Sequence, residues 1–305
     1  MPVATSSYDP PSQRVKGLDA LRFVLAMWVV FGHVGLPPVD ESERTVARAV
    51  YHNIISGPAA VIVFFVISGF CIHFPYRNGR SLDLLSFYAR RHIRILVPVA
   101  VASMIAAPLG IKLALLSDSI LWSLLCEEIY YTIYPFLRLL AARVGFGVLF
   151  SLTLVLSYVV AFTLPNDGNY PSYHWGLNWV LGLPCWLLGC MLAESCELAR
   201  RSSIPTSRRI WYWRLTVWGL SVVCSVLRFH TQVTYPYTLN LFAIVAAVWL
   251  RYEIRVADAQ GASWLEPAGR ISYSIYLMHL QAHAIWKWFR QEPHPTSTAV
   301  WIVQI

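Results

Sequence analysis

The chain has 305 residues, of which 57% are hydrophobic and 13% charged, and its formal net charge at pH 7 is +8. A soluble domain carries about 25% charged residues, so this composition excludes a disordered chain and a typical soluble enzyme. It indicates an all-α integral membrane protein. The basic excess lies in short clusters between apolar runs, which favours membrane topology over nucleic-acid binding as its explanation.

Apolar runs of about 20 residues are the segments that cross a bilayer as helices. In chain order they lie near 18–36, 54–74, 95–111, 119–137, 144–164, 175–193, 211–229, 236–250 and 271–289. A tenth run begins near 297 and is cut short at Ile305. We therefore expect nine to ten transmembrane helices in a single domain over residues 1–305, with the last helix truncated. The third run, which holds Pro98 and Pro108, and the short eighth run carry the weakest patterns.

The loop charges predict a cytoplasmic N-terminus. When the spans alternate from that start, 18 of the 24 Lys and Arg residues fall on the cytoplasmic side and the other 6 on the opposite side. Cytoplasmic loops carry such an excess. Residues 1–17 then form a short cytoplasmic segment, and the first run is expected to be an uncleaved anchor because it is long and lacks a small-residue cleavage site.

The six cysteines lie in or beside apolar runs. They form no CxxC pair, and no His/Cys cluster in the sequence has the spacing of a zinc site. We expect reduced thiols embedded in the membrane and no bound metal.

Ionisable side chains inside a span cost about 2.5–3.5 kcal/mol each, so they mark candidate functional positions. Arg22 and His33 lie in the first run, eleven residues apart, which corresponds to about 16 Å along a helix. In the predicted orientation Arg22 lies near the cytoplasmic face and His33 toward the outer face. His33 suits a general base because imidazole titrates near neutral pH. The alternatives are a snorkelling anchor for Arg22 and an interfacial, helix-end histidine for His33.

Two adjacent carboxylates, Glu127 and Glu128, enter the fourth run. Tyr131 shares a helix face with Glu127, and Ser123 lies on that face one turn earlier. We expect Glu127 at a depth close to that of His33, where a carboxylate would orient the ring and raise its basicity. The alternative is an interfacial helix start with both carboxylates in water.

The segment FYARRHIRIL is predicted to be a cytoplasmic loop between the second and third runs. Arg91 and Arg94 are three residues apart in it and can grip one phosphate together, although plain anchoring of the topology is the alternative. In the ninth run His279 falls mid-span and is expected to face the protein interior or a wet cavity. Its alternative role is a structural bond to a neighbouring helix.

The second run carries small residues that favour close helix packing. These residues are Gly57, Ala59, Ala60, Ser68 and Gly69.

Taken in order, five segments resemble the acyltransferase 3 family of multi-span membrane acyltransferases. The pair Arg22-x10-His33 resembles the signature of the family's first span, and GPAAVIVFFVISGF at 57–70 is similar to its Gly-rich second span. Three further matches are Arg91-x-x-Arg94, WSLLCEEIYYTIYP at 122–135 and SYSIYLMH at 272–279. The family usually has ten spans, so the chain departs from it in the tenth.

The resemblance implies transfer of an acyl group, usually acetyl, from acyl-CoA to a hydroxyl of a cell-envelope glycan or related acceptor. The setting it implies is the bacterial cytoplasmic membrane. In that scheme Arg91 and Arg94 hold the CoA phosphates, and Arg22 helps to position the donor. It implies no metal, no resident cofactor and no nucleic acid.

In the same scheme His33 takes the proton of the acceptor hydroxyl, or carries the acyl group itself for a time. Glu127 orients or charges His33, with Ser123 and Tyr131 in support. His279 belongs to the same substrate site.

A transporter or flippase for a glycan or lipid is the competing prediction, because polar residues in mid-membrane also suit a transport path. The two halves of the chain show no internal repeat, which argues against it. Dependence on acyl-CoA discriminates between the two. A purely structural or sensory membrane protein is a third option, although the small loops leave no domain to bind a partner.

Overall fold

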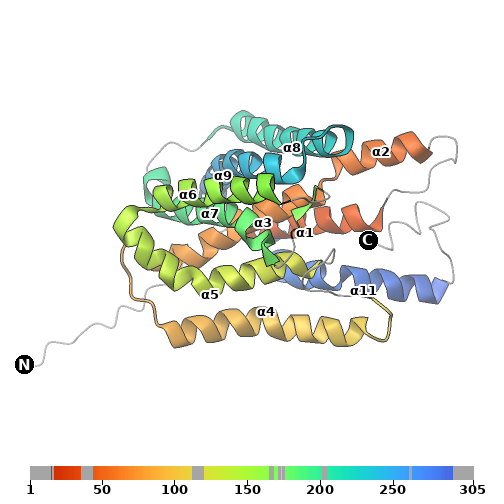
Figure 1. Ribbon diagram of the computed structural model, residues 1–305, viewed down its shortest axis with the longest axis horizontal. Helices are drawn as coiled ribbons and strands as arrows, with labels where there is room; N and C mark the ends of the chain where they lie inside the picture. The colour runs from red at the N-terminus through yellow and green to blue at the C-terminus, as the bar shows by residue number, and fades with distance from the viewer. Residues whose placement is uncertain are drawn as a thin grey trace, which may run out of the picture.

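The computed structural model describes residues 15, 17–35, 44–111, 120–164, 168–170, 173, 176–200, 205–260 and 263–290. All regular elements in these residues are helical. They are α1 (Leu18–Val34), α2 (Arg44–Ile54), α3 (Gly57–His73), η1 (Phe74–Tyr76), α4 (Leu84–Ala106), α5 (Leu121–Val144), α6 (Phe146–Thr163), α7 (Asn178–Arg200), α8 (Ser207–His230), α9 (Tyr235–Gln260), α10 (Glu266–Gly269) and α11 (Ser272–Arg290). Figure 1 shows the long helices running along the longest axis, with α4 and α8 at opposite edges of the view.

Each of the nine complete apolar runs predicted from the sequence coincides with a helix of the described residues. The two runs with the weakest patterns, 95–111 and 236–250, lie in the long helices α4 and α9. Pro98 lies inside α4 without ending it. The predicted tenth run and most of segment 1–17 lie outside the described residues.

Two helical segments differ from the sequence prediction. The basic segment expected to be a loop is the first half of α4, because Asp83 precedes it with extended backbone and residues 84–97 contain no Gly or Pro. Three arginines lowered its hydropathy without weakening its helix propensity. Helix α2 was not predicted at all, since it is short and too polar to form an apolar run.

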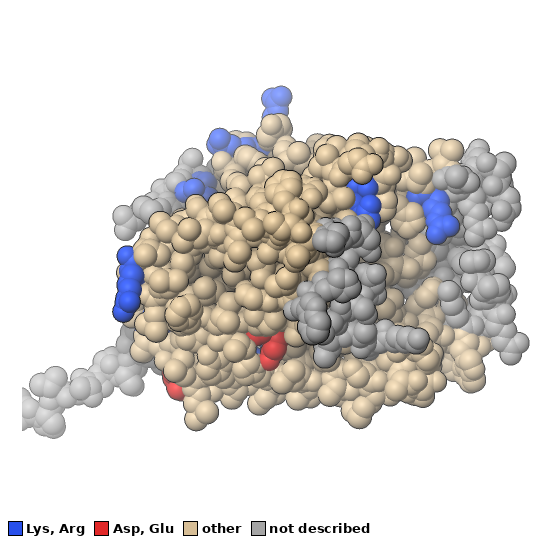
Figure 2. All heavy atoms as spheres, in the orientation of Figure 1, with Lys and Arg blue, Asp and Glu red and all other residues tan. Residues whose placement is uncertain are grey.

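Four segments are long and apolar enough to cross a membrane, judged by length and composition of the described residues. They are Val46–Tyr76, Phe146–Thr163, Asn178–Cys196 and Ser207–His230. Only 22% of the α6 segment is buried, against 78% of the α7 segment. Exposed apolar surface on this scale is typical of a protein that meets lipid. Figure 2 shows a face with few charged side chains, in keeping with that character.

Helices α3 and α7 lie in the middle of the bundle and touch backbone to backbone (Figure 1). A Cβ added at Gly69 would lie 1.9 Å from the Trp186 carbonyl oxygen, and one at Gly189 would lie 2.0 Å from that of Val66. Only glycine permits these approaches. The predicted packing role of the small residues in the second run is confirmed at Gly69.

Helices α4 and α5 are joined by polar contacts that set their register. The Tyr88 hydroxyl donates to the Thr132 carbonyl at 3.0 Å, and one turn further along α4 His92 bonds to Glu128. Helix α11 packs against α4 and α1, while α1 also packs against α3. These contacts bring α1, α3, α4, α5 and α11 around one polar interior.

Candidate functional site

A cavity of about 80 Å³ lies where α1, α3, α4, α5 and α11 meet. Six of the eight site residues predicted from the sequence line it. They are Arg22, Arg91, Arg94, Ser123, Glu127 and Tyr131. The other two, His33 and His279, lie together beyond it along α1 and α11.

Glu127 is the acidic residue of this cavity. Its carboxylate interacts with the hydroxyls of Ser68 and Tyr131, and the positive charges of Arg22 and Arg94 act on it. The Ser68 hydroxyl also bonds to the Tyr131 hydroxyl at 3.0 Å and accepts from the Trp186 indole at 3.3 Å. Helix α3 therefore supplies a polar anchor, Ser68, that the sequence analysis assigned only to helix packing.

The sequence predicted that Glu127 lies beside His33 and orients its ring. Within the described residues no hydrogen bond or ion pair joins the two, and the nearby α1 charge is Arg22. Positions 22 and 33 share a helix face, because eleven residues make slightly more than three full turns. Glu127 and His33 differ in depth along α1. Glu127 lies at the level of Arg22, whereas His33 lies about 16 Å further along the helix.

The start of α5 explains this depth. The Tyr276 hydroxyl donates to the Ile120 carbonyl at 2.9 Å, so α5 begins beside the first turns of α11, one turn before His279. The prediction placed the start of the fourth run at the outer surface of the membrane. With that start, the predicted position of Glu127 was close to His33 and far from Arg22.

His33 and His279 form a pair whose ring centroids are 4.9 Å apart. His33 Nδ1 lies 2.9 Å from the Val29 carbonyl, and His279 Nδ1 lies 2.5 Å from the Tyr276 carbonyl. A carbonyl only accepts, so each Nδ1 is the proton donor, and in the neutral ring the lone pair lies on Nε2. His279 is buried, and its Nε2 has no hydrogen-bond partner among the described residues. Two basic nitrogens are thus held in one place.

Tyr276 connects the cavity to the histidine pair. It lines the cavity, and its ring centroid lies 6.1 Å from that of His279. Its hydroxyl bonds to Ser123 Oγ at 2.8 Å. Ser123, which the sequence predicted to support Glu127, lines the same cavity as Glu127 and bonds to Tyr276. The SYSIYLMH segment thus contributes to both parts of the site.

The cavity is strongly cationic. Arg91, Arg94 and Arg270 line it together with Arg22, and Glu127 is the one carboxylate among its described lining residues. The sequence did not identify Arg270 as a site residue, although it lies two residues before the segment 272–279. Guanidinium groups match phosphate oxygens in geometry and charge, so this wall can hold a phosphorylated ligand.

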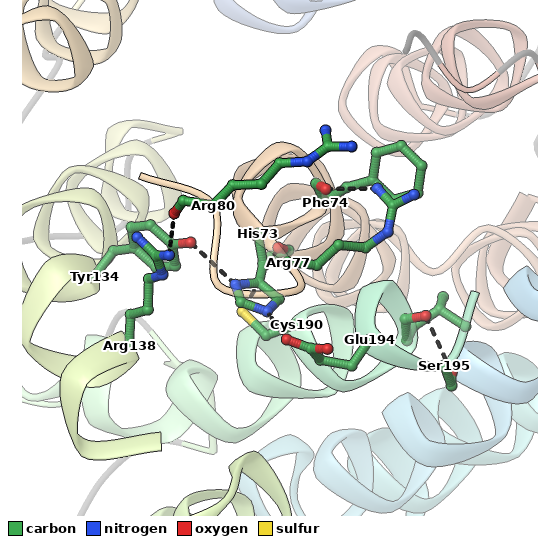
Figure 3. A network of polar contacts seen from close by, with 11 residues as sticks. His73, Phe74, Arg77, Arg80, Tyr134, Arg138, Cys190, Glu194 and Ser195 are labelled. Atoms are coloured by element: carbon green, nitrogen blue, oxygen red, sulfur yellow. Dashed lines mark hydrogen bonds and ion pairs between the residues drawn. The ribbon is translucent and has the colours of Figure 1, made fainter. Parts of the chain in front are cut away.

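A second polar cluster, also missed, joins α3, α5 and α7 away from the cavity (Figure 3). His73 Nε2 bonds to Glu194 Oε1 at 2.6 Å, and its Nδ1 to the Tyr134 hydroxyl at 3.0 Å. The His73 side chain is 2% exposed and that of Glu194 42%. Beside it, Arg77 donates to the Phe74 carbonyl at 2.7 Å. Both ring nitrogens are satisfied, so this histidine ties three helices together and is not available as a base.

A membrane-type helical bundle with a cationic, phosphate-compatible cavity beside two histidines has the features of a membrane-embedded transferase. The model of the acyltransferase 3 family, described as an acyltransferase domain, matches residues 15–305. The chain belongs to this family. It is also similar to acyltransferase MdmB of Streptomyces mycarofaciens, with 25% identity over 324 residues that cover 88% of this chain and 79% of that protein. No solved structure matches the chain.

Proposed function

We propose that this protein is a membrane O-acyltransferase that moves an acyl group, acetyl in the simplest case, from acyl-CoA to a hydroxyl of a cell-envelope glycan or related acceptor. The observation that carries the proposal is the arrangement of one site in two parts. Arg22, Arg91 and Arg94 line a cationic cavity, and Tyr276 leads from it to the histidine pair. Family membership supports acyl transfer over the transport alternative.

In the proposed reaction, the guanidinium groups of Arg91, Arg94 and Arg270 bind the phosphates of the donor. His33 Nε2 removes the proton of the acceptor hydroxyl, and the hydroxyl oxygen bonds to the thioester carbon in the same step. When the tetrahedral intermediate collapses, the C–S bond breaks and the CoA thiolate takes that proton from the imidazolium. The products are an ester and free CoA, and no proton is gained or lost overall.

A second route uses the same atom. His33 Nε2 attacks the thioester carbon, the C–S bond breaks, and an acyl-imidazolium and the CoA thiolate form. The acceptor oxygen then bonds to the acyl carbon, the C–N bond breaks, and the hydroxyl proton passes to the CoA thiolate. In either route the Val29 carbonyl holds the ring through Nδ1–H, which leaves Nε2 free to react. The His279 ring, with its centroid 4.9 Å away, limits the rotation of the His33 ring.

We further propose nine to ten membrane spans, a cytoplasmic N-terminus that includes residues 1–17, and a bacterial cytoplasmic membrane as the location. The distribution of basic residues in the sequence supports this orientation. Arg91 and Arg94, near the start of α4, then face the side on which acyl-CoA is found. His33, at the far end of α1, faces the side of an envelope acceptor.

The test uses membranes that contain the full chain, labelled acetyl-CoA and a pool of cell-envelope glycans. The proposal predicts release of free CoA thiol together with label in the glycan fraction. Membranes without the protein are the control. Inserted, folded protein that consumes no acyl-CoA with any acceptor in the pool, but moves a glycan across vesicles, would establish the transport alternative instead.

A further inference from the structure

A second, larger cavity lies on the other side of α1. It has a volume of about 790 Å³ and is bounded by α1, α3, α8 and α9. Volumes of about 300–1,000 Å³ are typical of sites for organic ligands. None of its described lining residues is a histidine or a cysteine, so those residues offer no imidazole or thiol for acyl transfer. It is a site separate from the proposed reaction.

Most of the cavity is apolar. Helix α1 contributes Leu21, Leu25 and Trp28, which lie on one stripe of that helix, and α9 contributes Phe242. Between Leu18 and Trp28 the stripe extends for about 15 Å. A space of this length and lining suits a hydrocarbon chain and offers little to water, which needs two to four polar partners.

One ion pair marks a polar end of the cavity. Arg214 donates through Nε and Nη2 to the carboxylate of Glu253 at 2.7 and 3.0 Å, and the Trp249 indole donates to the same carboxylate at 2.8 Å. The Arg214 Nη1 has no hydrogen-bond partner among the described residues, and the side chain is 38% exposed. A further anion can therefore bind this guanidinium.

The ion pair also lies at the depth expected for a lipid headgroup. Trp211 and Tyr212, within one turn of Arg214 on α8, are 58% and 64% exposed. Exposed Trp and Tyr at a helix end are typical of the membrane–water interface. The polar end of the cavity is thus at the interface, and its apolar length extends into the hydrocarbon region.

From this arrangement we propose that the cavity binds one zwitterionic glycerophospholipid of the surrounding bilayer, with its phosphate on Arg214 and one acyl chain along α1. The paired charges of Arg214 and Glu253 sum to zero, which matches a headgroup that carries both a phosphate and an amine. An anionic headgroup without an amine would leave a net charge there. The proposal is independent of the acyl-transfer reaction, since it uses no residue of the small cavity.

Native mass spectrometry of the purified full chain tests the proposal, with palmitoyl-oleoyl phosphatidylethanolamine and the corresponding phosphatidylglycerol as probes. Wild type is expected to keep one phosphatidylethanolamine after the detergent is stripped, and to bind phosphatidylglycerol about 10-fold more weakly. Ser221→Phe, which fills the cavity from α8, should abolish retention. Val63→Phe fills it from α3 and serves if the first variant does not fold.

Arg214→Gln should weaken binding about 10-fold, whereas Arg209→Gln on the same helix should leave it unchanged, because Arg209 does not line the cavity. Retention that survives both Phe substitutions would overturn the proposal. Equal affinity for the two lipids, or equal losses in the two arginine variants, would overturn it as well. If wild type retains no lipid, other residues of the chain fill the cavity, and the proposal is overturned.

Discussion

The imidazole rings of His33 and His279, from the two ends of the sequence, lie with their centroids 4.9 Å apart. Each ring gives its Nδ1 proton to a carbonyl of the preceding turn of its own helix. Both rings are therefore held in the same tautomer, with Nε2 as the basic atom. The proposed base thus has a second imidazole, and not a carboxylate, as its neighbour.

The histidine pair predicts a specific kinetic effect. His279→Ala should lower kcat about 10-fold and leave KM for acyl-CoA within about twofold, because His279 positions His33 and does not bind the donor. Initial rates over a range of acyl-CoA concentrations measure both constants. A raised KM with unchanged kcat would show instead that His279 binds the donor. His52→Ala, in α2 outside the cavity, is the control.

The interaction of Arg22 with Glu127 predicts coupling in stability. Glu127→Gln removes a carboxylate whose charge acts on Arg22 but leaves the Arg22–Asp19 ion pair at 3.5 Å, so we expect a loss of about 1–3 kcal/mol. The double variant Arg22→Gln/Glu127→Gln should lose less than the sum of the two single variants. Unfolding of the purified protein in a denaturing detergent measures these free energies. Additive losses would show that the two residues do not interact.

The cationic wall predicts an effect on donor binding. Arg91→Lys or Arg94→Lys should raise KM for acyl-CoA about 10-fold with kcat little changed, because Lys keeps the charge but loses the two-pronged contact with phosphate. Arg90→Lys, one position along α4 and outside the cavity, should have no effect. If all three variants behave alike, the arginines serve topology and not the donor.

The α3–α7 contact predicts which glycines tolerate a methyl group. Gly69→Ala places a Cβ 1.9 Å from a carbonyl oxygen and should prevent the two helices from packing, so little folded protein is expected. Gly147→Ala, in α6 with no atom within 4 Å of the added Cβ, should be neutral or slightly stabilising. Gel filtration of a fluorescent fusion compares the yields. Equal yields would contradict the packing described here.

Hydropathy predicted the helices well, because a spanning segment must satisfy its backbone within itself and must be apolar where it meets lipid. It missed α2 and the first half of α4, where polar residues are helical through propensity and packing. Six of the predicted site residues share the cavity, since ionisable side chains in a span must turn inward.

Partners across the bundle were not predictable in the same way. Helical periodicity placed Glu127 on the correct face, but its depth depended on where α5 begins, and that start is set by the contact of Tyr276 with Ile120. The pairing of His33 with His279 similarly requires α1 and α11 to pack together, which no local pattern encodes. His73 at the end of α3 gave no signal that separated it from an interfacial histidine.

The proposed role of His33 is tested most directly by measuring acyl transfer in the His33→Ala variant. Membranes containing wild type, His33→Ala or the control His52→Ala receive labelled acetyl-CoA and envelope glycans. His33→Ala is expected to insert normally but to transfer at least about 100-fold more slowly than the other two, because a general base usually contributes that much to the rate. Transfer by folded His33→Ala at the wild-type rate would remove His33 from the mechanism and contradict the proposed site.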